Sequence, residues 1–311
     1  MTLAVVFPGQ GSQSVGMLAE LAAEFAEVEQ TFAEASEVLG YDLWQLVQNG
    51  PESELQLTAV TQPAMLTAGV AVWRAWQAAG GPTPAVMAGH SLGEYSALVC
   101  AQALPFAQAV KLVRLRGEYM QQAVPVGSGA MAAILGLERA AVEAACAGAL
   151  HDDETVSVAN YNAPLQTVIA GHTDAVNRAG AAAQAAGAKR VVPLPVSAPF
   201  HCSLMRPAAE QLTPALTEAT FSPPQVPVIN NADVASVNDP TAIRDALIRQ
   251  IYSPVRWVEV IEAMACRGIT RVVECGPGKV LASLTKRICG DLDSLAVLDP
   301  ASLRQALSTL N

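Results

Sequence analysis

The chain has 311 residues, of which 51% are hydrophobic and only 15% charged, and its formal net charge is −10. This length fits about two domains, or one large α/β domain with an insertion, and the composition excludes a disordered chain. The negative charge argues against nucleic acid as a partner, and no apolar run approaches the ~18 residues of a membrane span. Six widely spaced cysteines without a CxxC pair favour reduced thiols over disulfides or a zinc site. With no signal-like N-terminus, we expect a cytoplasmic protein.

Strand-like and helix-like segments alternate through most of the chain, which indicates a largely parallel sheet with helices on both faces. We expect strands at 3–7, 85–88, 226–230 and 271–275, and helices at 17–39, 62–79, 94–103, 106–120, 205–217, 240–251 and 255–267, with a last helix that opens near 278.

Between about 125 and 199 the order of elements changes. Strands are expected at 129–137, 155–161, 165–171 and 189–196, and helices at 138–149 and 173–186. The order βαββαβ is that of a ferredoxin-like module. We therefore predict an α/β-hydrolase-like main domain with a parallel sheet, residues 1–124 and 200–311, and an inserted ferredoxin-like subdomain, residues 125–199.

The sequence Gly89-His90-Ser91-Leu92-Gly93 lies between an expected strand and an expected helix. Glycines two positions either side of a serine allow a sharp turn that exposes the hydroxyl, so Ser91 is a candidate nucleophile. The next amide, that of Leu92, could then stabilise an oxyanion. The alternative is a serine N-cap between two glycines that pack closely.

A serine hydroxyl needs a base within hydrogen-bond reach. Of the four histidines, we favour His201, because it follows two prolines where the inserted module ends and the main domain resumes. His90 is expected to have a structural role in the packing of the turn. Acids between the serine and the histidine cluster in the inserted module, which favours a Ser-His dyad over a triad: Asp152, Asp153, Glu154 and Asp174.

Seven segments resemble, in order and spacing, the malonyl-CoA:acyl carrier protein transacylases of bacterial fatty-acid synthesis. The match covers essentially the whole chain, and acyltransferase domains of polyketide synthases share these motifs more loosely. The segments are Phe7 to Gln13, Thr61 to Ala64, Ala88 to Cys100, Arg116-Gly117, Gly129 to Ala132, Pro199 to His201 and Glu274 to Gly278.

The resemblance implies that Ser91 accepts the acyl group and that His201 is its general base and acid. The backbone amides of Gln10 and Leu92 would form the oxyanion hole, and the backbone carbonyl of Gln250 would orient the histidine. It also implies the substrates malonyl-CoA and phosphopantetheinylated acyl carrier protein, with no cofactor and no metal.

Arg116 is implied to pair with the free carboxylate of the malonyl group. Stand-alone bacterial enzymes often carry serine before the histidine, whereas this chain carries Phe200, whose ring would reject a methyl branch. An acidic carrier protein would dock on a local basic patch of a monomeric enzyme. Candidates for that patch are Lys189, Arg190, Lys279, Lys286 and Arg287.

Three alternatives stay open. The chain could serve a polyketide or malonate-decarboxylating system instead of fatty-acid synthesis. It could be a serine thioesterase or hydrolase, although Arg116 and the missing acid count against that class. A non-catalytic scaffold that has kept the fold is the third reading.

Overall fold

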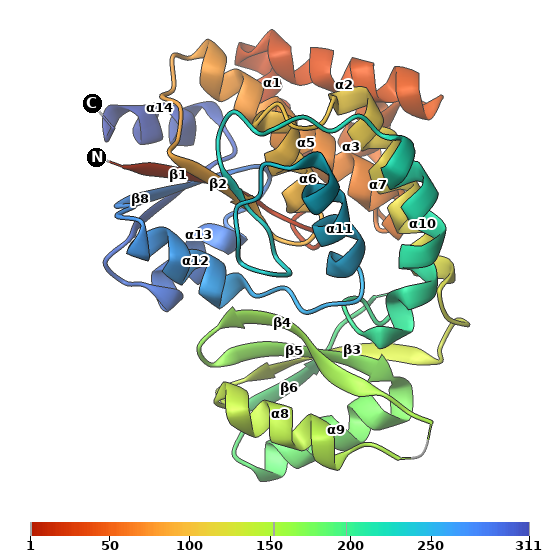
Figure 1. Ribbon diagram of the computed structural model, residues 1–311. Coiled ribbons are helices and arrows are strands. Elements are labelled where there is room, and N and C mark those ends of the chain that lie inside the picture. Colours follow the sequence, from red (N-terminus) through yellow and green to blue (C-terminus); the bar gives the residue numbers. More distant parts are fainter. Residues whose placement is uncertain (1, 152, 197, 311) are drawn as a thin grey trace.

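The structure, a computed structural model, describes residues 2–151, 153–196 and 198–310. Its strands form two sheets (Figure 1). Sheet A is parallel, with the strand order β7-β2-β1-β8-β9, and sheet B is antiparallel, with the order β4-β5-β3-β6. Sheet A lies among most of the helices, and sheet B lies below it in Figure 1 with two helices of its own.

Sheet A is covered on both faces, which explains why its first strand reads as an uninterrupted apolar run. Val5 and Phe7 belong to the same hydrophobic core as helix α5, whereas Ala4 and Val6 share a second core with α12 and α13. The strands of sheet A are β1 (Leu3–Phe7), β2 (Val86–Gly89), β7 (Val228–Ile229), β8 (Arg271–Cys275) and β9 (Asp293–Val297).

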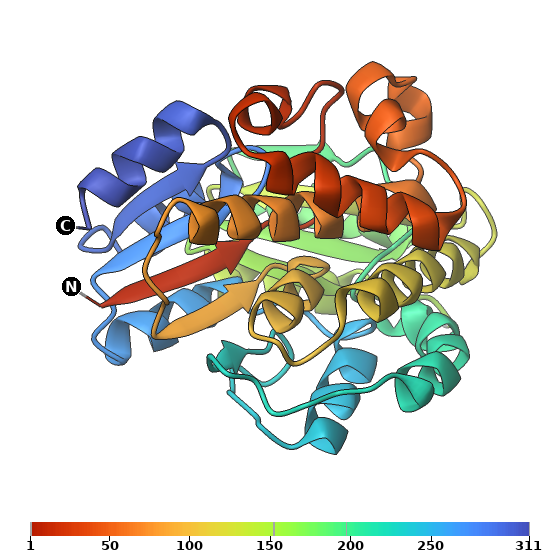
Figure 2. The ribbon, with the colours of Figure 1, turned by 90° about the horizontal axis from the view of Figure 1, so that it is seen from above.

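Twelve α-helices of the described residues surround sheet A (Figure 2). They are α1 (Ala19–Glu24), α2 (Ala26–Leu39), α3 (Leu43–Asn49), α4 (Glu52–Leu55), α5 (Thr58–Ala78), α6 (Gly93–Cys100), α7 (Phe106–Gln122), α10 (Arg206–Glu218), α11 (Pro240–Gln250), α12 (Trp257–Cys266), α13 (Val280–Ile288) and α14 (Pro300–Ser308), with a 3₁₀ turn at Ser203–Met205.

Two sequence-based expectations about these elements are wrong. The single helix expected over 17–39 is broken by Phe25, whose extended backbone (φ −126°, ψ 103°) separates α1 from α2. The helix expected to be last, near 278, is α13, and it is followed by β9 and α14. The short helices α3 and α4 were also not expected.

Sheet B has the ferredoxin-like arrangement, because the four strands of the βαββαβ unit lie in the spatial order second, third, first, fourth. The predicted fold class is thereby confirmed, while the domain limits at 125 and 199 stay a prediction. Helices α8 and α9 cover the face of sheet B that is turned away from sheet A (Figure 1). The elements are β3 (Gly129–Leu135), α8 (Arg139–Gly148), β4 (Val156–Ala163), β5 (Gln166–His172), α9 (Thr173–Ala185) and β6 (Arg190–Pro193).

Backbone hydrogen bonds join the part of the chain that contains sheet A directly to the part that contains sheet B. The Val255 amide donates to the Ala159 carbonyl at 2.8 Å, and the Tyr161 amide donates to the Val255 carbonyl at 2.9 Å. The segment before α12 therefore pairs with the edge of β4.

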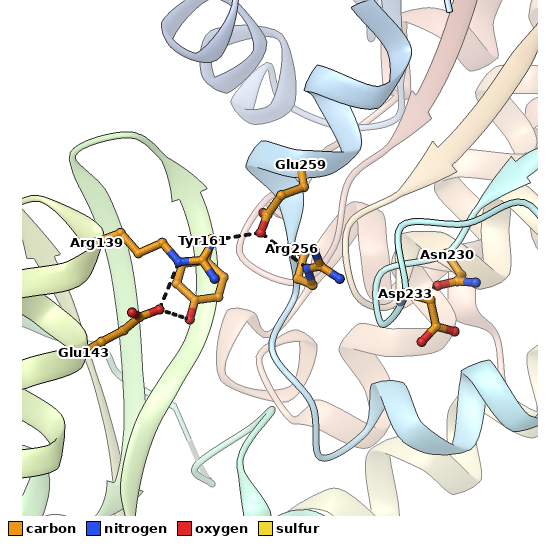
Figure 3. A network of polar contacts seen from close by, with 7 residues as sticks. All are labelled: Arg139, Glu143, Tyr161, Asn230, Asp233, Arg256 and Glu259. Atoms are coloured by element: carbon orange, nitrogen blue, oxygen red, sulfur yellow. Dashed lines mark hydrogen bonds and ion pairs between the residues drawn. The ribbon is translucent and has the colours of Figure 1, made fainter. Parts of the chain in front are cut away.

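Side chains reinforce this junction (Figure 3). Arg139 of α8 stacks on the Tyr161 ring, 3.7 Å from its centroid, and its guanidinium contacts Glu259 of α12 at 2.7 Å. The Tyr161 hydroxyl donates to Glu143 at 2.7 Å. Because these groups are partly exposed, we attribute only a modest stabilisation to the ion pair itself.

No helix in the described part of the chain is both long and apolar enough to cross a membrane. All six cysteines are free, and four of them, Cys100, Cys146, Cys202 and Cys275, are buried.

Candidate active site

Ser91 lies at the sharp turn between β2 and α6, with a φ of +53° that non-glycine residues rarely adopt. The two flanking glycines are sterically required. A Cβ atom on Gly89 would come within 1.8 Å of the Gly93 backbone, and one on Gly93 would come within 2.1 Å of the Phe7 carbonyl oxygen. The turn therefore has the geometry expected of a nucleophile elbow.

His201 meets Ser91 from a segment more than a hundred residues away. The Ser91 Oγ lies 2.6 Å from His201 Nε2, and His201 Nδ1 lies 2.9 Å from the backbone carbonyl oxygen of Gln250. A carbonyl can only accept, so Nδ1 carries the proton and Nε2 is free to accept the serine proton. Burial, followed by the positive charge of Arg116, lowers the pKa of His201 to about 3. The imidazole is therefore neutral at physiological pH, the form in which Nε2 can accept a proton.

A backbone carbonyl thus occupies the place that a carboxylate takes in a triad. Of the acids considered from the sequence, Glu154 pairs with Arg178 and Asp174 lies in the first turn of α9. Asp152 lies outside the described residues.

Arg116 of α7 is almost completely buried and points at the dyad. Its guanidinium donates to the Ser91 Oγ at 3.2 Å, to the Gln62 Oε1 at 2.9 Å and to the Gln250 Oε1 at 2.9 Å. Burial is the main influence on its pKa, which is lowered, yet an arginine keeps its charge in proteins. A fixed cation therefore lies beside the candidate nucleophile, Ser91.

The loop after β1 brings Gln10 to the same place. Within the described residues, the backbone amides of Gln10 and Leu92 donate no hydrogen bond to another protein group. The Gln10 side chain is held by the Gln62 amide at 3.3 Å. Two free amides near a serine are the donors that an oxyanion requires.

Ser91 opens into a cleft of about 490 Å³ between the two sheets' units. Phe200 lies in its wall next to the histidine and is largely buried. The cleft is lined by the loop after β1, the elbow, sheet B and α13: Pro8 to Gln13, Gln56, Thr58, His90, Ser91, Met131, Asn160, Asn162, Gln166, Val168, Leu194 to Val196, Phe200, His201, Val280, Leu281 and Leu284.

His90 borders the same cleft. Its Nε2 lies 2.8 Å from the Asn162 Oδ1, and its ring packs against Trp257 at 5.4 Å between centroids. Burial lowers the pKa of His90, so it too is neutral. These contacts agree with the packing role expected for His90, whereas Asn162 was not predicted.

Sequence reasoning also missed the buried polar residues that surround the dyad: Gln62, Glu94, Asn231 and the side chain of Gln250. Each looks like an ordinary helix or loop residue in the sequence. For Gln62, the resemblance of the segment Thr61 to Ala64 was the one available signal. No group of three or more metal-binding side chains occurs among residues 2–151, 153–196 and 198–310.

The five basic candidates for a docking patch are all exposed. Lys286 and Arg287 lie in α13, whose apolar side lines the cleft, and Lys279 precedes that helix. The Arg287 guanidinium donates at 2.7 Å to Gln166, a residue of the cleft wall. Arg190 is the first residue of β6, and Lys189 precedes it.

The fold and the Ser-His pair define a serine acyltransferase class, and comparison with known proteins agrees. A family model described as acyl transferase domain matches residues 4–297. The chain therefore belongs to the acyl transferase family.

Comparison with individual proteins indicates which acyl transferases the chain is similar to. The chain is 59% identical over 305 residues to the malonyl CoA-acyl carrier protein transacylase of Salmonella typhimurium, and the match covers 98% of both proteins. It superposes with a TM-score of 0.96 on the crystal structure of an acyl carrier protein S-malonyltransferase from Vibrio cholerae, at 60% identity over 98% of this chain and 100% of that one. A malonyl-transacylase in complex with a type II PKS acyl-carrier protein gives a TM-score of 0.98 at 56% identity, over 99% of this chain and 100% of that one.

Proposed function

We propose that this enzyme transfers the malonyl group from malonyl-CoA to the phosphopantetheine thiol of acyl carrier protein, in two steps through a malonyl ester of Ser91. The observation that carries the proposal is the buried Arg116 guanidinium 3.2 Å from the Ser91 Oγ. It is a fixed positive charge within hydrogen-bond reach of the free carboxylate of a malonyl group bound at Ser91. The names of the relatives from Salmonella and Vibrio support the same substrates.

In the first step, Ser91 attacks the thioester carbonyl carbon while its hydroxyl proton passes to His201 Nε2. The tetrahedral oxyanion accepts hydrogen bonds from the amides of Gln10 and Leu92, and each such donor contributes about 3 kcal/mol. The C–S bond then breaks, the imidazolium protonates the departing CoA thiolate, and malonyl-Ser91 remains. Gln250 keeps the imidazole oriented through its carbonyl.

In the second step, the carrier's thiol gives its proton to His201 Nε2 and attacks the ester carbonyl. The new tetrahedral state uses the same two amides. Its collapse breaks the bond to Oγ, and the serine recovers its proton from the imidazolium. The exchange of one thioester for another is balanced without a cofactor or metal.

Selectivity follows from the buried charge. A malonyl carboxylate pairs with the Arg116 fork, whereas an acetyl group leaves the guanidinium without its anionic partner in a water-poor site. Phe200 lies in the cleft wall beside the dyad and disfavours acyl groups with a methyl branch.

The acidic carrier would dock on Lys189, Arg190, Lys279, Lys286 and Arg287. The similar solved structure in which a malonyl-transacylase is in complex with an acyl-carrier protein supports a carrier protein as partner. We take the acting unit to be the monomer, because one chain supplies the dyad, the arginine and both amides. The free cysteines fit a cytoplasmic location.

Intact-protein mass spectrometry tests the proposal. Brief mixing with malonyl-CoA is expected to give one malonyl adduct, which passes to holo acyl carrier protein when the carrier is added. An adduct that decays to free malonate instead would indicate a hydrolase, and a chain that forms no adduct would indicate a scaffold.

A further inference from the structure

A buried carboxylate lies directly beneath the elbow and has no part in the mechanism above. Glu94 belongs to the first turn of α6 and is only 2% exposed. A single oxygen, Oε2, accepts two hydrogen bonds, the first from the Gln250 Nε2 and the second from the Asn231 amide, both at 2.8 Å. A buried carboxyl group is tolerated only when it is bonded in this way, so both donors are needed in place.

The first of these contacts fixes the direction of the Gln250 carboxamide. Its Nε2 donates to Glu94 and also to the Ser91 carbonyl at 2.9 Å, while its Oε1 accepts from Arg116 at 2.9 Å. If the amide turned over, its NH₂ group would face the guanidinium and its oxygen would face the carboxyl group. The Gln250 NH₂ group and the Arg116 guanidinium, both donors, would then face each other. The acceptor oxygen of Glu94 therefore selects the one carboxamide orientation in which Gln250 Oε1 accepts from Arg116.

The second contact supports the strained turn. The Asn231 Oδ1 accepts from the Ser91 amide at 2.7 Å, and its Nδ2 donates to the Gly89 carbonyl at 2.7 Å. Asn231 follows β7, which pairs with β2, so its side chain continues the pairing past the end of the strand. A serine held at positive φ needs such surroundings to persist.

We propose that Glu94 is a positioning residue whose acceptor oxygen, acting through Gln250 and Asn231, keeps Arg116 and the Ser91 backbone in the arrangement used for malonyl transfer. The inference rests on the proposed function and deepens it. Glu94 Oε2 acts as a hydrogen-bond acceptor, and the negative charge of the carboxylate is not required. The carbonyl oxygen of a neutral carboxyl group can accept the same two hydrogen bonds. Burial raises the pKa of Glu94 to about 7, which is consistent with a role that does not require the ionised form.

Two substitutions separate position from charge. Glu94→Gln keeps an acceptor oxygen at the same distance but removes the charge, whereas Glu94→Asp keeps the charge but withdraws the acceptor by about 1.5 Å, one C–C bond. We expect Glu94→Gln to stay within about threefold of the wild-type acylation rate per folded molecule. We expect Glu94→Asp to lose roughly 10–100-fold, the loss typical of supporting residues. The ratio of malonyl to acetyl transfer should fall only in Glu94→Asp, because Glu94 no longer orients the Gln250 side chain that contacts Arg116 in that variant.

Glu274 supplies the matched control. It is also a fully buried glutamate, and burial raises its pKa to about 7, but it accepts from the Ala282 amide at the start of α13 and has no contact with Gln250 or Asn231. Glu274→Gln and Glu274→Asp should change the melting temperature without changing the malonyl-to-acetyl ratio. If the Glu94 substitutions acted only through a general loss of stability, the Glu274 substitutions would change the acylation rate and the ratio in the same way.

The rate at which a fluorophosphonate probe labels Ser91 is measured in the same variants, because that reaction needs no malonyl group. Slower labelling in Glu94→Asp alone supports the positioning role even if the wild type transfers no malonyl, an outcome that would refute only the proposed function. An unchanged rate and ratio in Glu94→Asp would overturn the inference. So would a Glu94→Gln variant that acylates far more slowly than the wild type per folded molecule, and this second result decides the matter if the aspartate variant does not fold.

Discussion

Replacing Arg116 by alanine should convert a malonyl-selective enzyme into one that discriminates poorly. In the proposed function, the guanidinium gives two charge-assisted hydrogen bonds to the malonyl carboxylate, each worth about 1.5–3 kcal/mol. We take about 3 kcal/mol as the loss specific to malonyl, which corresponds to roughly a 100-fold fall in kcat/KM. Acetyl transfer loses no such contact and should fall far less.

The substitution has a second effect that the assay must separate. Arg116→Ala leaves the Gln62 and Gln250 side-chain oxygens without their donor in a buried site, at a cost of about 1–3 kcal/mol each. Stability should therefore drop, and rates must be expressed per folded molecule after thermal unfolding. Rapid mixing with malonyl-CoA or acetyl-CoA, followed by mass spectrometry of the adduct, gives the two acylation rates.

Arg114 offers a control on the same helix. It is exposed, pairs with Glu118 at 3.0 Å and points away from the dyad toward the Leu39 carbonyl. Arg114→Ala should leave the malonyl-to-acetyl ratio unchanged. If Arg116→Ala slowed both acyl groups equally, or if Arg114→Ala changed the ratio as much, the assignment of the carboxylate to Arg116 would be refuted.

Four further predictions concern the other groups of the site. Ser91→Ala should abolish the malonyl adduct while the protein stays folded, and labelling at full stoichiometry would exclude Ser91 as the nucleophile. Phe200→Ser should raise the rate with methylmalonyl-CoA relative to malonyl-CoA, and an unchanged ratio would remove the steric argument. Because the pKa of His201 is lowered to about 3, the base form persists as pH falls, so kcat/KM for acylation should stay level from pH 8 to below 6; a decline centred near 6.5 would contradict this. Charge reversal at Lys286 and Arg287 should raise KM for the carrier protein at low salt but leave KM for malonyl-CoA unchanged, and equal effects on both would argue against docking there.

Most of the architecture was predictable because four of the five parallel strands carry a local signal. Buried strands such as Leu3–Phe7 read as apolar runs, and the βαββαβ order of sheet B follows from alternating patterns. The strand Asp293–Val297 was not predicted because it lies at the edge of the sheet and is mostly half-buried, so it does not read as an apolar run. Helix α14 did carry a signal, a capping box in which Asp299 and Ser302 bond each other's backbones just before and after Pro300.

The candidate nucleophile and base were predictable for a different reason. The spacing of Gly89, Ser91 and Gly93 is dictated by the turn itself, and the position of His201 between module and main domain marks a cleft. The supporting residues are not local. Glu94 reaches Asn231 and Gln250 across more than 130 residues of sequence, and such a network exists only after the chain has folded.

The short stretch from Gln250 to Val255 serves both halves of the molecule. At one end its carbonyl holds the imidazole of His201, and at the other its backbone is paired with Ala159 and Tyr161 of β4. One short segment therefore connects the βαββαβ unit to the carbonyl that orients the base, so a chimera that exchanges this unit with a relative's would need to bring residues 250–255 with it.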